Sequence, residues 1–423
     1  MKKVNTSPIS GMQELLPATQ ATFDKLKATI TDVYHAHGYL HIETPVIDRC
    51  EILLAKAGGD TEKQIYKVVK TAEAEDGGNQ ALRFDHTVPL ARYVVEHEND
   101  LQFPFKVTQI GRNFRGERAQ RGRFRELYQC DVDVIGRGEL PLYYDADAIS
   151  TLLDTFSKFE LGTPVLARMN NRKILSGLLK EYNLENKSEE VFSIIDHAEK
   201  VPAEKTKAAF EEIGLGSDRV EKLLSFVEIN GAREKVIPEL LKLGIQDDTF
   251  EEGVKELEYV MKLLEEDGRG NEIAADMKIV RGLDYYTGTV FEFILPEYKY
   301  VGSVCGGGRY ENLAEYFTEQ KLPGVGGSIG LTRLFFVLNE EGLVKDTAVQ
   351  PVDVAVVPIS EAEVAYALKV AAELREQGKS VTIVGTDKKL GDKLKYAAKV
   401  ARAGVVLGET EVETGKYDFK IFE

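Results

Sequence analysis

The chain has few cysteines and no long apolar run. Its 423 residues include three cysteines, Cys50, Cys130 and Cys305, which have neither the spacing of a disulfide framework nor that of a zinc site. No apolar stretch approaches the roughly 20 residues that span a bilayer. The N-terminal MKKVNTSPISGMQELLP has two lysines but no apolar block after them, which argues against a secretory signal. These absences predict a cytoplasmic protein with reduced thiols and no membrane partner.

Basic residues are outnumbered by acidic ones, 54 to 70, and the formal net charge of the chain is -16. This balance argues against a general nucleic-acid coat protein. It does not exclude a specific nucleic-acid partner, because binding depends on the local potential rather than on the sum of charges. Hydrophobic residues make up 43% and charged residues 29%, as is typical of a globular protein. The length predicts two or three domains.

Apolar periodicity predicts mixed helices and strands in the first part of the chain. Phe23, Leu26, Ile30 and Val33 are spaced by three or four residues and form one face of a helix over about residues 20 to 37. The extended segment YLHIETPVID follows and is interrupted by a proline. QALRFDHTVPLARYVVEH indicates a strand leading into a helix. FPFKVTQIGRNFR and ELYQCDVDVIG indicate an antiparallel pair of strands joined by a long loop.

The later part of the chain changes its pattern twice. From about residue 173 to 268 helix follows helix, as in FEEGVKELEYVMKLLEEDG, and then strand-like DMKIVRGLDYYTGTVFEFIL follows. We interpret 173–268 as a helical insertion that divides one β-containing domain into residues 1–172 and 269–345. Over residues 350–423 strand-like and helical segments alternate, which predicts a small α/β domain with a largely parallel sheet.

Arginines gather in the loop between the two predicted antiparallel strands. They fill every cationic position in fourteen consecutive residues and do not share one helical face. A solvated charged surface would explain such a run, but arginine is the side chain suited to bidentate contact with phosphate. The loop therefore favours a triphosphate, a nucleic-acid end, or both. The six arginines are Arg112, Arg115, Arg118, Arg121, Arg123 and Arg125.

Three further stretches contain patterns that can indicate a binding or catalytic site, but only one of them favours such a site here. The glycine-rich CGGGRY and GVGGSIG match neither the P-loop nor GxGxxG after a strand, and by themselves are typical of turns or close-packing points. GGSIG matches the GxSxG elbow of hydrolases. All six histidines precede Ser328, however, whereas that fold needs its histidine after the serine. VRGLDYYTGTVFEF places an arginine, an acid and two tyrosines beside a strand, and we favour a site there over a buried strand alone.

Taken in order, these stretches resemble a known family. GRNFRGERAQRGRF…YQCDVDVIG resembles motif 2 of class II aminoacyl-tRNA synthetases, GVGGSIGLTRLFFVL resembles motif 3, and GYLHIETPVID resembles motif 1. RGLDYYTGTVFE and CGGGRYENL are similar to two stretches diagnostic of histidyl-tRNA synthetases. The resemblance covers essentially the whole chain. It implies an α+β catalytic domain with an antiparallel sheet of the class II synthetase type, a helical insertion and a C-terminal α/β anticodon-binding domain.

The resemblance also implies an activity. Members of this family are ligases that join L-histidine to ATP, release pyrophosphate, and pass the histidyl group from the adenylate to histidine tRNA. ATP and Mg²⁺ are the implied cofactors, and no protein side chain is implied as a metal ligand. The motif 1 likeness implies a homodimer. Because the first step is attack of a carboxylate on the α-phosphate, catalysis consists mainly of positioning and of neutralising charge.

Motif positions imply residues for ATP and tRNA. Arg115 and Arg281 are the implied catalytic residues: Arg115 matches the arginine that bridges the α-phosphate and the substrate carboxylate, and Arg281 matches the arginine opposite the reacting phosphoryl group. Glu117 matches the carboxylate that contacts the adenine amine. The implied contacts to the outer phosphates, whose charge magnesium shares, are Arg123 and Arg333. The implied contacts to the acceptor end of the tRNA are Arg118 and Gln120.

A second implied set holds histidine, whose ammonium and imidazole groups both need acceptors. Arg115 and Arg281 are shared with the ATP site, and Tyr285 belongs to the diagnostic stretch. The implied ammonium ligands are Asp85, Thr87 and Gln129, and the implied imidazole contacts are Asp133, Tyr286 and Tyr310.

The chain departs from the family pattern at three positions. Leu127 stands where a phenylalanine usually stacks on adenine, Thr332 where most relatives have glutamate, and Ala119 where the loop usually has proline.

Two alternative functions remain open. Non-catalytic regulatory subunits of ATP phosphoribosyltransferase, in histidine biosynthesis, share the catalytic fold but generally lack the C-terminal module and the ATP-binding arginines, which this chain has. A class II synthetase for another amino acid, such as proline or threonine, would share motifs 2 and 3 but would not explain RGLDYYTG or the acids at 85 and 133.

Overall fold

The computed structural model divides into two units by its residue contacts: Met1–Glu14 with Phe23–Lys345, and Leu15–Thr22 with Asp346–Glu423. The predicted boundaries of a helical insertion stay a prediction. Arg281 lies outside the residues that the structure describes. Those residues are 3–55, 59–71, 78–198, 201–280, 285–344, 352–385 and 388–422.

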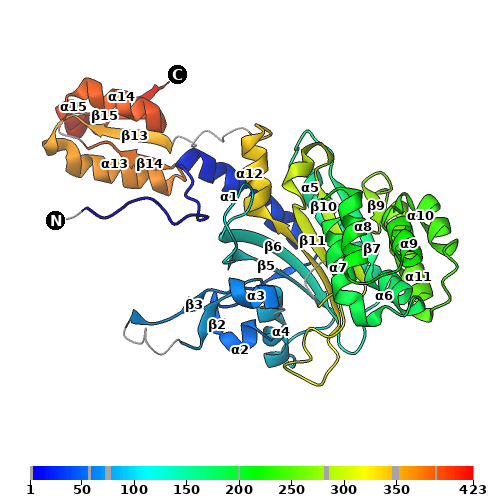
Figure 1. Cartoon of the computed structure of the whole chain (residues 1–423). Helices are drawn as coiled ribbons and strands as arrows, with labels where there is room; N and C mark the ends of the chain where they lie inside the picture. Colours follow the sequence, from blue (N-terminus) through cyan, green and yellow to red (C-terminus); the bar gives the residue numbers. More distant parts are fainter. Residues whose placement is uncertain are drawn as a thin grey trace. The chain divides into compact units, whose positions relative to one another are not determined.

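A nine-stranded sheet lies at the centre of the larger unit (Figure 1). Neighbouring strands are antiparallel except for two parallel pairs, β1 with β5 and β7 with β9. The expected antiparallel sheet is therefore confirmed. In spatial order the strands are β1 (Leu40–His41), β5 (Phe105–Phe114), β6 (Glu126–Ile135), β12 (Gly324–Gly330), β11 (Cys305–Tyr310), β10 (Thr289–Ile294), β7 (Leu166–Asn171), β9 (Ile273–Asp276) and β8 (Asn230–Gly231).

The glycine-rich stretches are strands in the middle of this sheet. The interpretation of CGGGRY and GVGGSIG as turns is wrong, because they form β11 and β12, whereas their interpretation as close-packing points is confirmed. A Cβ on Gly307 would lie 2.1 Å from the Gly326 backbone oxygen and 2.5 Å from the Phe291 ring. Only glycine leaves room for these neighbours.

A smaller antiparallel sheet is separate from the large sheet, and its strands in spatial order are β2 (Ile47–Arg49), β4 (Gln80–Leu82) and β3 (Lys67–Val68).

The helices that the structure describes up to residue 340 include those predicted from the sequence. The helices are α1 (Pro17–Ala36), α2 (Cys50–Leu53), α3 (Gly59–Gln64), α4 (Thr87–Glu96), α5 (Tyr143–Ser157), α6 (Arg172–Glu181), η2 (Glu185–Lys187), α7 (Ser188–His197), α8 (Ala203–Glu212), α9 (Ser217–Val227), α10 (Arg233–Leu241), α11 (Asp248–Glu266), η3 (Pro296–Val301) and α12 (Leu331–Glu340).

Helix α11 shows how the sequence builds the helical block, which lies beside β7 and β9 in Figure 1. The Asp247 carboxylate accepts the Thr249 and Phe250 backbone N–H groups, at 2.9 and 3.1 Å, and so caps the first turn. Gly253 lets α11 approach α6, since a Cβ there would lie 2.8 Å from the Ile174 backbone nitrogen. The buried stripe repeats every three or four residues, at Phe250, Val254, Leu257, Met261 and Leu264.

The two faces of the large sheet have different coverings. On β6 the residues Cys130, Val132 and Val134 are fully buried. They share a face with Gly327, which lies opposite Val132 and whose Cβ would be 2.8 Å from Leu152 of α5. Helix α5 therefore covers this face. The opposite face of the same strands carries the polar side chains described below.

The smaller unit is an α/β domain, as predicted. Its sheet is parallel except for the last strand. Val354 and Val356 pack with α13 on one face, and Ala355 and Val357 pack with Ala397 of α14 on the other. The elements are β13 (Val352–Pro358), η4 (Glu361–Glu363), α13 (Val364–Glu376), β14 (Val381–Ile383), α14 (Leu390–Val400), β15 (Ala401–Leu407), α15 (Glu409–Thr414) and β16 (Phe419–Ile421), and the strand order is β14-β13-β15-β16.

Candidate active site

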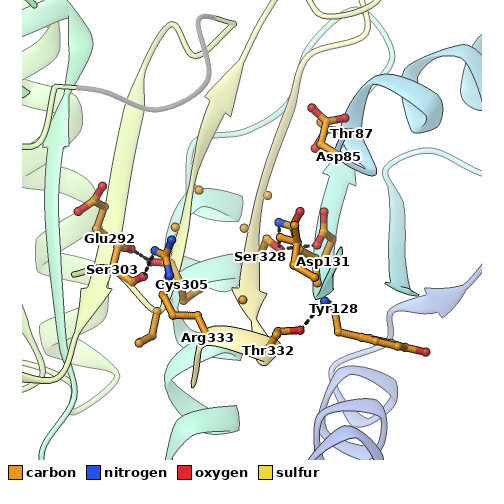
Figure 2. A pocket seen from close by; sticks show the side chains of 18 of the residues that line it. Asp85, Thr87, Tyr128, Asp131, Glu292, Ser303, Cys305, Ser328, Thr332 and Arg333 are labelled. Carbon is orange, nitrogen blue, oxygen red and sulfur yellow. Dashed lines mark hydrogen bonds between the residues drawn. The ribbon is translucent and has the colours of Figure 1, made fainter. Parts of the chain in front are cut away.

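A cavity of ≈ 290 Å³ lies over the glycine-rich strands of the large sheet. Strand register builds its floor: Asp131 of β6 lies opposite Ser328 of β12, Ser328 opposite Gly306 of β11, and Gly306 opposite Glu292 of β10. Directly opposed residues share a face of a sheet, so these side chains point to the same side. Figure 2 shows Asp131 beside Ser328, with Glu292 and Ser303 across the pocket.

One end of the cavity is acidic and aromatic. Asp85, Asp133 and Tyr310 line it and are 8%, 5% and 1% exposed. The Tyr310 hydroxyl donates to Asp133 Oδ1 at 3.0 Å. The Asp85 carboxylate accepts the Val88 backbone N–H at 3.1 Å, at the start of α4. Thr87, in the first turn of the same helix, also lines the pocket.

Two glycines make room for this acidic end. A Cβ on Gly326 would lie 2.2 Å from Asp133 Oδ1, and a Cβ on Gly308 would lie 2.9 Å from Tyr286 Cδ1. The Tyr285 ring stacks edge-on against Tyr286, with centroids 4.9 Å apart. The strands therefore have glycine at the two positions where Asp133 and Tyr286, two of the predicted imidazole-contacting residues, approach them.

Burial dominates the electrostatics of the acidic end. Burial raises the pKa of Asp133 well above its ordinary value, and the negative charge of Asp131 raises it further. Burial also raises the pKa of Asp85, while the Val88 N–H and the Arg115 charge oppose that rise. The pKa values of Tyr286 and Tyr310 are raised by the same cause, so their hydroxyls stay protonated. Such a site favours a ligand that brings positive charge and N–H donors.

The other end of the cavity is cationic. Arg115, Arg123 and Arg333 line it. Arg333, in the first turn of α12, donates through Nε to the Gly122 oxygen at 3.1 Å and through Nη1 to the Ser303 oxygen at 2.8 Å. Burial lowers the pKa of Arg333, and the charges of Arg123 and Arg115 lower it further. Like charges held together at a helix N-terminus favour a polyanion.

Arg115 lies where the two ends meet. Its Nη2 donates to Gln129 Oε1 at 3.2 Å and its Nε donates to the Phe84 oxygen at 3.3 Å. The guanidinium also lies over the Phe84 ring, 4.5 Å from the centroid. Glu117 lines the pocket and approaches Arg123, with 3.5 Å between Oε2 and Nη1. These contacts fix Arg115 and leave part of its fork facing the cavity.

Not every predicted site residue lies in the cavity. Arg118 and Gln120 are exposed in the loop between β5 and β6 and do not line it. Nothing is described for Arg281, so its predicted place in the site stays a prediction. Among the described residues, no cluster of three or more His, Cys, Asp or Glu side chains has the arrangement of a metal site. In the same part of the chain, no helix has the length and apolarity needed to cross a bilayer.

Sequence reasoning did not identify Asp131 and Ser328 as site residues. Asp131 lies between Gln129 and Asp133 at a spacing of two, so strand alternation alone places all three on one face. That signal was available from the sequence. Ser328 required the pairing of β6 with β12. Thr332, a departure from the family pattern, accepts the Tyr128 backbone N–H at 2.6 Å and so ties α12 to β6.

The chain is similar to known proteins over its full length. A model of the histidyl-tRNA synthetase family matches residues 11–334, and a model of an anticodon binding domain matches residues 353–423. The histidine–tRNA ligase of Clostridium tetani (strain Massachusetts / E88) is 44% identical, covering 100% of this chain and 96% of that protein.

Solved structures have the same fold. The crystal structure of histidyl-tRNA synthetase from Nostoc sp. PCC 7120 is 36% identical, with a TM-score of 0.83, and covers 99% of this chain and 95% of that chain. A structure from Bacillus halodurans C, described as an ATP phosphoribosyltransferase regulatory subunit/histidyl-tRNA synthetase, has a TM-score of 0.76 and covers 93% of this chain and 97% of that one. Its identity is 21%, so this likeness concerns the fold alone.

Proposed function

Because the chain belongs to the histidyl-tRNA synthetase family, we propose that it joins L-histidine to histidine tRNA through a histidyl-adenylate made from ATP. The observation that carries the proposal is the division of one cavity into an acidic end and a cationic end, with Arg115 between them. Free histidine brings an ammonium group, an imidazole and a carboxylate, and ATP brings the polyphosphate. The cavity offers a complementary partner for each of these groups.

In this proposal Asp85, Thr87 and Gln129 hold the ammonium group. Asp133, Tyr286 and Tyr310 face the imidazole. Buried acceptors of this kind reject an amino acid whose side chain cannot supply the N–H groups, because the carboxylate would be left unpaired. A hydrogen bond already joins Tyr310 to Asp133, so the acceptor is oriented before the ligand arrives.

The arginines hold ATP. Arg115 lies between the predicted ammonium ligand Gln129 and the cationic end, where one guanidinium can contact both the attacking carboxylate and the α-phosphate. Arg123 and Arg333 take the outer phosphates, and Mg²⁺ bound with ATP would neutralise part of the negative charge of the phosphates. The carboxylate oxygen attacks the α-phosphorus and pyrophosphate leaves toward Arg333. Arg281 completes the reacting centre as a prediction from the sequence.

Partners and location are proposed on the same basis. The match to an anticodon binding domain supports tRNA as the second substrate, and Arg118 and Gln120 are exposed in the loop where an acceptor end would approach.

A homodimer is supported by exposed apolar side chains in the segment that resembles motif 1. These are Leu40, Val46 and Ile47, which expose 60%, 40% and 44% of their surface. Sedimentation of the purified protein measures that state. A cytoplasmic location stays a prediction.

Exchange of labelled pyrophosphate into ATP tests the function. We expect exchange with histidine and none with proline or threonine. Arg115→Ala and Arg333→Ala should each lower the exchange rate by about 10²–10³-fold, the usual cost of a donor that stabilises developing charge. Arg112→Gln is the matched control, because Arg112 lies on β5 outside the cavity, 62% exposed, and pairs with Glu126.

The outcome also separates the alternatives. Exchange that depends on another amino acid would transfer the proposal to another class II synthetase. Absence of exchange with every amino acid, in a protein that is folded by circular dichroism, would favour the regulatory-subunit function that one structural neighbour carries in its description.

A further inference from the structure

A buried carboxylate in the cavity has no part in the proposed binding of histidine or ATP. Asp131 is 4% exposed and lies on β6 between Gln129 and Asp133. Its Oδ1 accepts the Ser328 hydroxyl at 2.5 Å, and the same oxygen lies 3.4 Å from Nδ1 of His86. A buried carboxylate costs free energy unless it is hydrogen-bonded or paired.

On one side, Asp131 ends a chain of hydrogen bonds that begins at Arg115. Arg115 Nη2 donates to Gln129 Oε1 at 3.2 Å, Gln129 Nε2 donates to Ser328 Oγ at 2.9 Å, and Ser328 Oγ donates to Asp131 Oδ1. A guanidinium can only donate, and a carboxylate can only accept. With these two groups at its ends, the chain has one self-consistent direction.

That direction decides which atom of Gln129 is available to a ligand. The Gln129 amide must turn its oxygen toward Arg115 and its nitrogen toward Ser328. Asn113 Nδ2, which is fully buried, also donates to this oxygen at 3.0 Å, so an ammonium group would share the oxygen with these two donors or replace one of them. An ammonium group can only donate, so the amide is useful to it in this orientation alone. A flipped Gln129 amide would present its N–H groups to the Arg115 guanidinium and to the ammonium group of the ligand.

On its other side, Asp131 contacts the segment that carries two predicted ammonium ligands. His86 lies between Asp85 and Thr87 in sequence, and its ring is 1% exposed. Both ring nitrogens are buried without a hydrogen bond among the described residues, and Asp131 Oδ1 approaches Nδ1 to 3.4 Å. The His86 backbone oxygen accepts Gln109 Nε2 at 3.1 Å, which holds the same turn.

We propose that Asp131 is a positioning residue for the ammonium group of the amino-acid substrate. Through Ser328 it fixes the orientation of the Gln129 amide, and its close approach to the His86 ring supports the turn that presents Asp85 and Thr87. Asp131 itself need not touch the substrate. This inference rests on the proposed function and deepens it.

Asp131→Asn tests the inference, because it keeps the shape but removes the negative charge and replaces one of the two acceptor oxygens by a donor, so that Ser328 is no longer obliged to donate to this residue. Ser328 can then donate toward Gln129, and the amide is free to flip. We expect the KM for histidine in pyrophosphate exchange to rise by about tenfold or more, as for the loss of a charged hydrogen bond. The KM for ATP should stay within about twofold, since the cationic end is unchanged.

Two comparisons isolate the mechanism. Glu126→Gln makes the same chemical change on the same strand, outside the cavity, and should leave both KM values unchanged. Ser328→Ala cuts the chain and should also raise the KM for histidine. In the double variant Asp131→Asn/Ser328→Ala the two effects should be strongly non-additive, because the Gln129 amide can lose its fixed direction only once.

Several results would overturn the inference. An unchanged KM for histidine in Asp131→Asn would do so, as would equal rises for histidine and ATP or effects of the two substitutions that simply multiply. If Asp131→Asn fails to fold, a histidine KM in Ser328→Ala equal to that of the wild type refutes the Gln129 chain. Wild-type protein without histidine-dependent exchange would instead refute the proposed function, so the two failures are distinguishable.

Discussion

A buried ion pair holds the strand that carries Tyr310. Arg309 of β11 is 5% exposed and Asp145 of α5 is 0% exposed. Arg309 donates to Asp145 Oδ1 through Nε at 3.0 Å and through Nη2 at 2.8 Å. It also donates to the Leu140 and Pro141 carbonyl oxygens, at 3.1 and 3.2 Å. Arg309 therefore joins the sheet to α5 at the residue before a predicted imidazole contact.

Arg309→Met removes the cation and keeps most of the apolar volume. The Asp145 charge is then buried without a cationic partner, and the Leu140 and Pro141 carbonyl oxygens lose the hydrogen bonds from Arg309, while the Pro141 oxygen keeps the Tyr144 N–H. Removing one partner of a buried pair costs about 3–5 kcal/mol. Burial already raises the pKa of Asp145, with the Arg309 charge opposing the rise, so the variant can take up a proton and avoid a larger cost. We expect a loss of about 3–5 kcal/mol in the free energy of unfolding.

Urea unfolding of the whole chain, followed by circular dichroism, measures this loss. Tryptophan fluorescence is not available because the sequence has none. Arg121→Met is the control: Arg121 pairs with Glu340 at 2.8 Å but is exposed, and its loss should change stability little. The double variant Arg309→Met/Asp145→Leu should recover part of the stability, since no lone charge remains. A loss below about 1 kcal/mol, or a double variant no more stable than Arg309→Met, would refute the reasoning.

Two further predictions concern the acidic end of the cavity. Burial raises the pKa of Asp133 above its unfolded value, so without ligand the folded protein holds that proton more tightly and loses stability as the pH rises from about 4 through the raised pKa. Asp133→Asn should remove this loss, so its unfolding midpoint should exceed that of the wild type increasingly toward alkaline pH, while histidine-dependent exchange falls. A stability difference that shrinks as pH rises would contradict this. Gly326→Ala should displace the Asp133 carboxylate and raise the KM for histidine, whereas Gly216→Ala, with nothing within 4 Å of its Cβ, should leave exchange unchanged. Equal KM values in the two alanine variants would show that the space at Gly326 is not needed.

Local patterns predicted the elements of this protein because their causes are local. The spacing of Phe250, Val254 and Leu257 specifies one buried face of a helix, and α11 has it. Alternation in FPFKVTQIGRNFR and ELYQCDVDVIG predicted the antiparallel pair β5 and β6. The same alternation places Asp131 on the face of Gln129 and Asp133. The glycine runs were predicted less well, because glycine is depleted in strands and frequent in turns.

The site itself depended on contacts between distant segments. Glycine at 326 and 308 is explained only when Asp133 and Tyr286 occupy the space above these strands. Ser328 lies 197 residues from Asp131 in sequence, and register alone brings their oxygen atoms to 2.5 Å. The sequence by itself determined most of the segments that form helices and strands, and the resemblance of its motifs predicted which residues belong to the site. Tertiary structure decided which of them share a cavity and which way the Gln129 amide points, because those depend on strand order and on donors and acceptors brought from different strands.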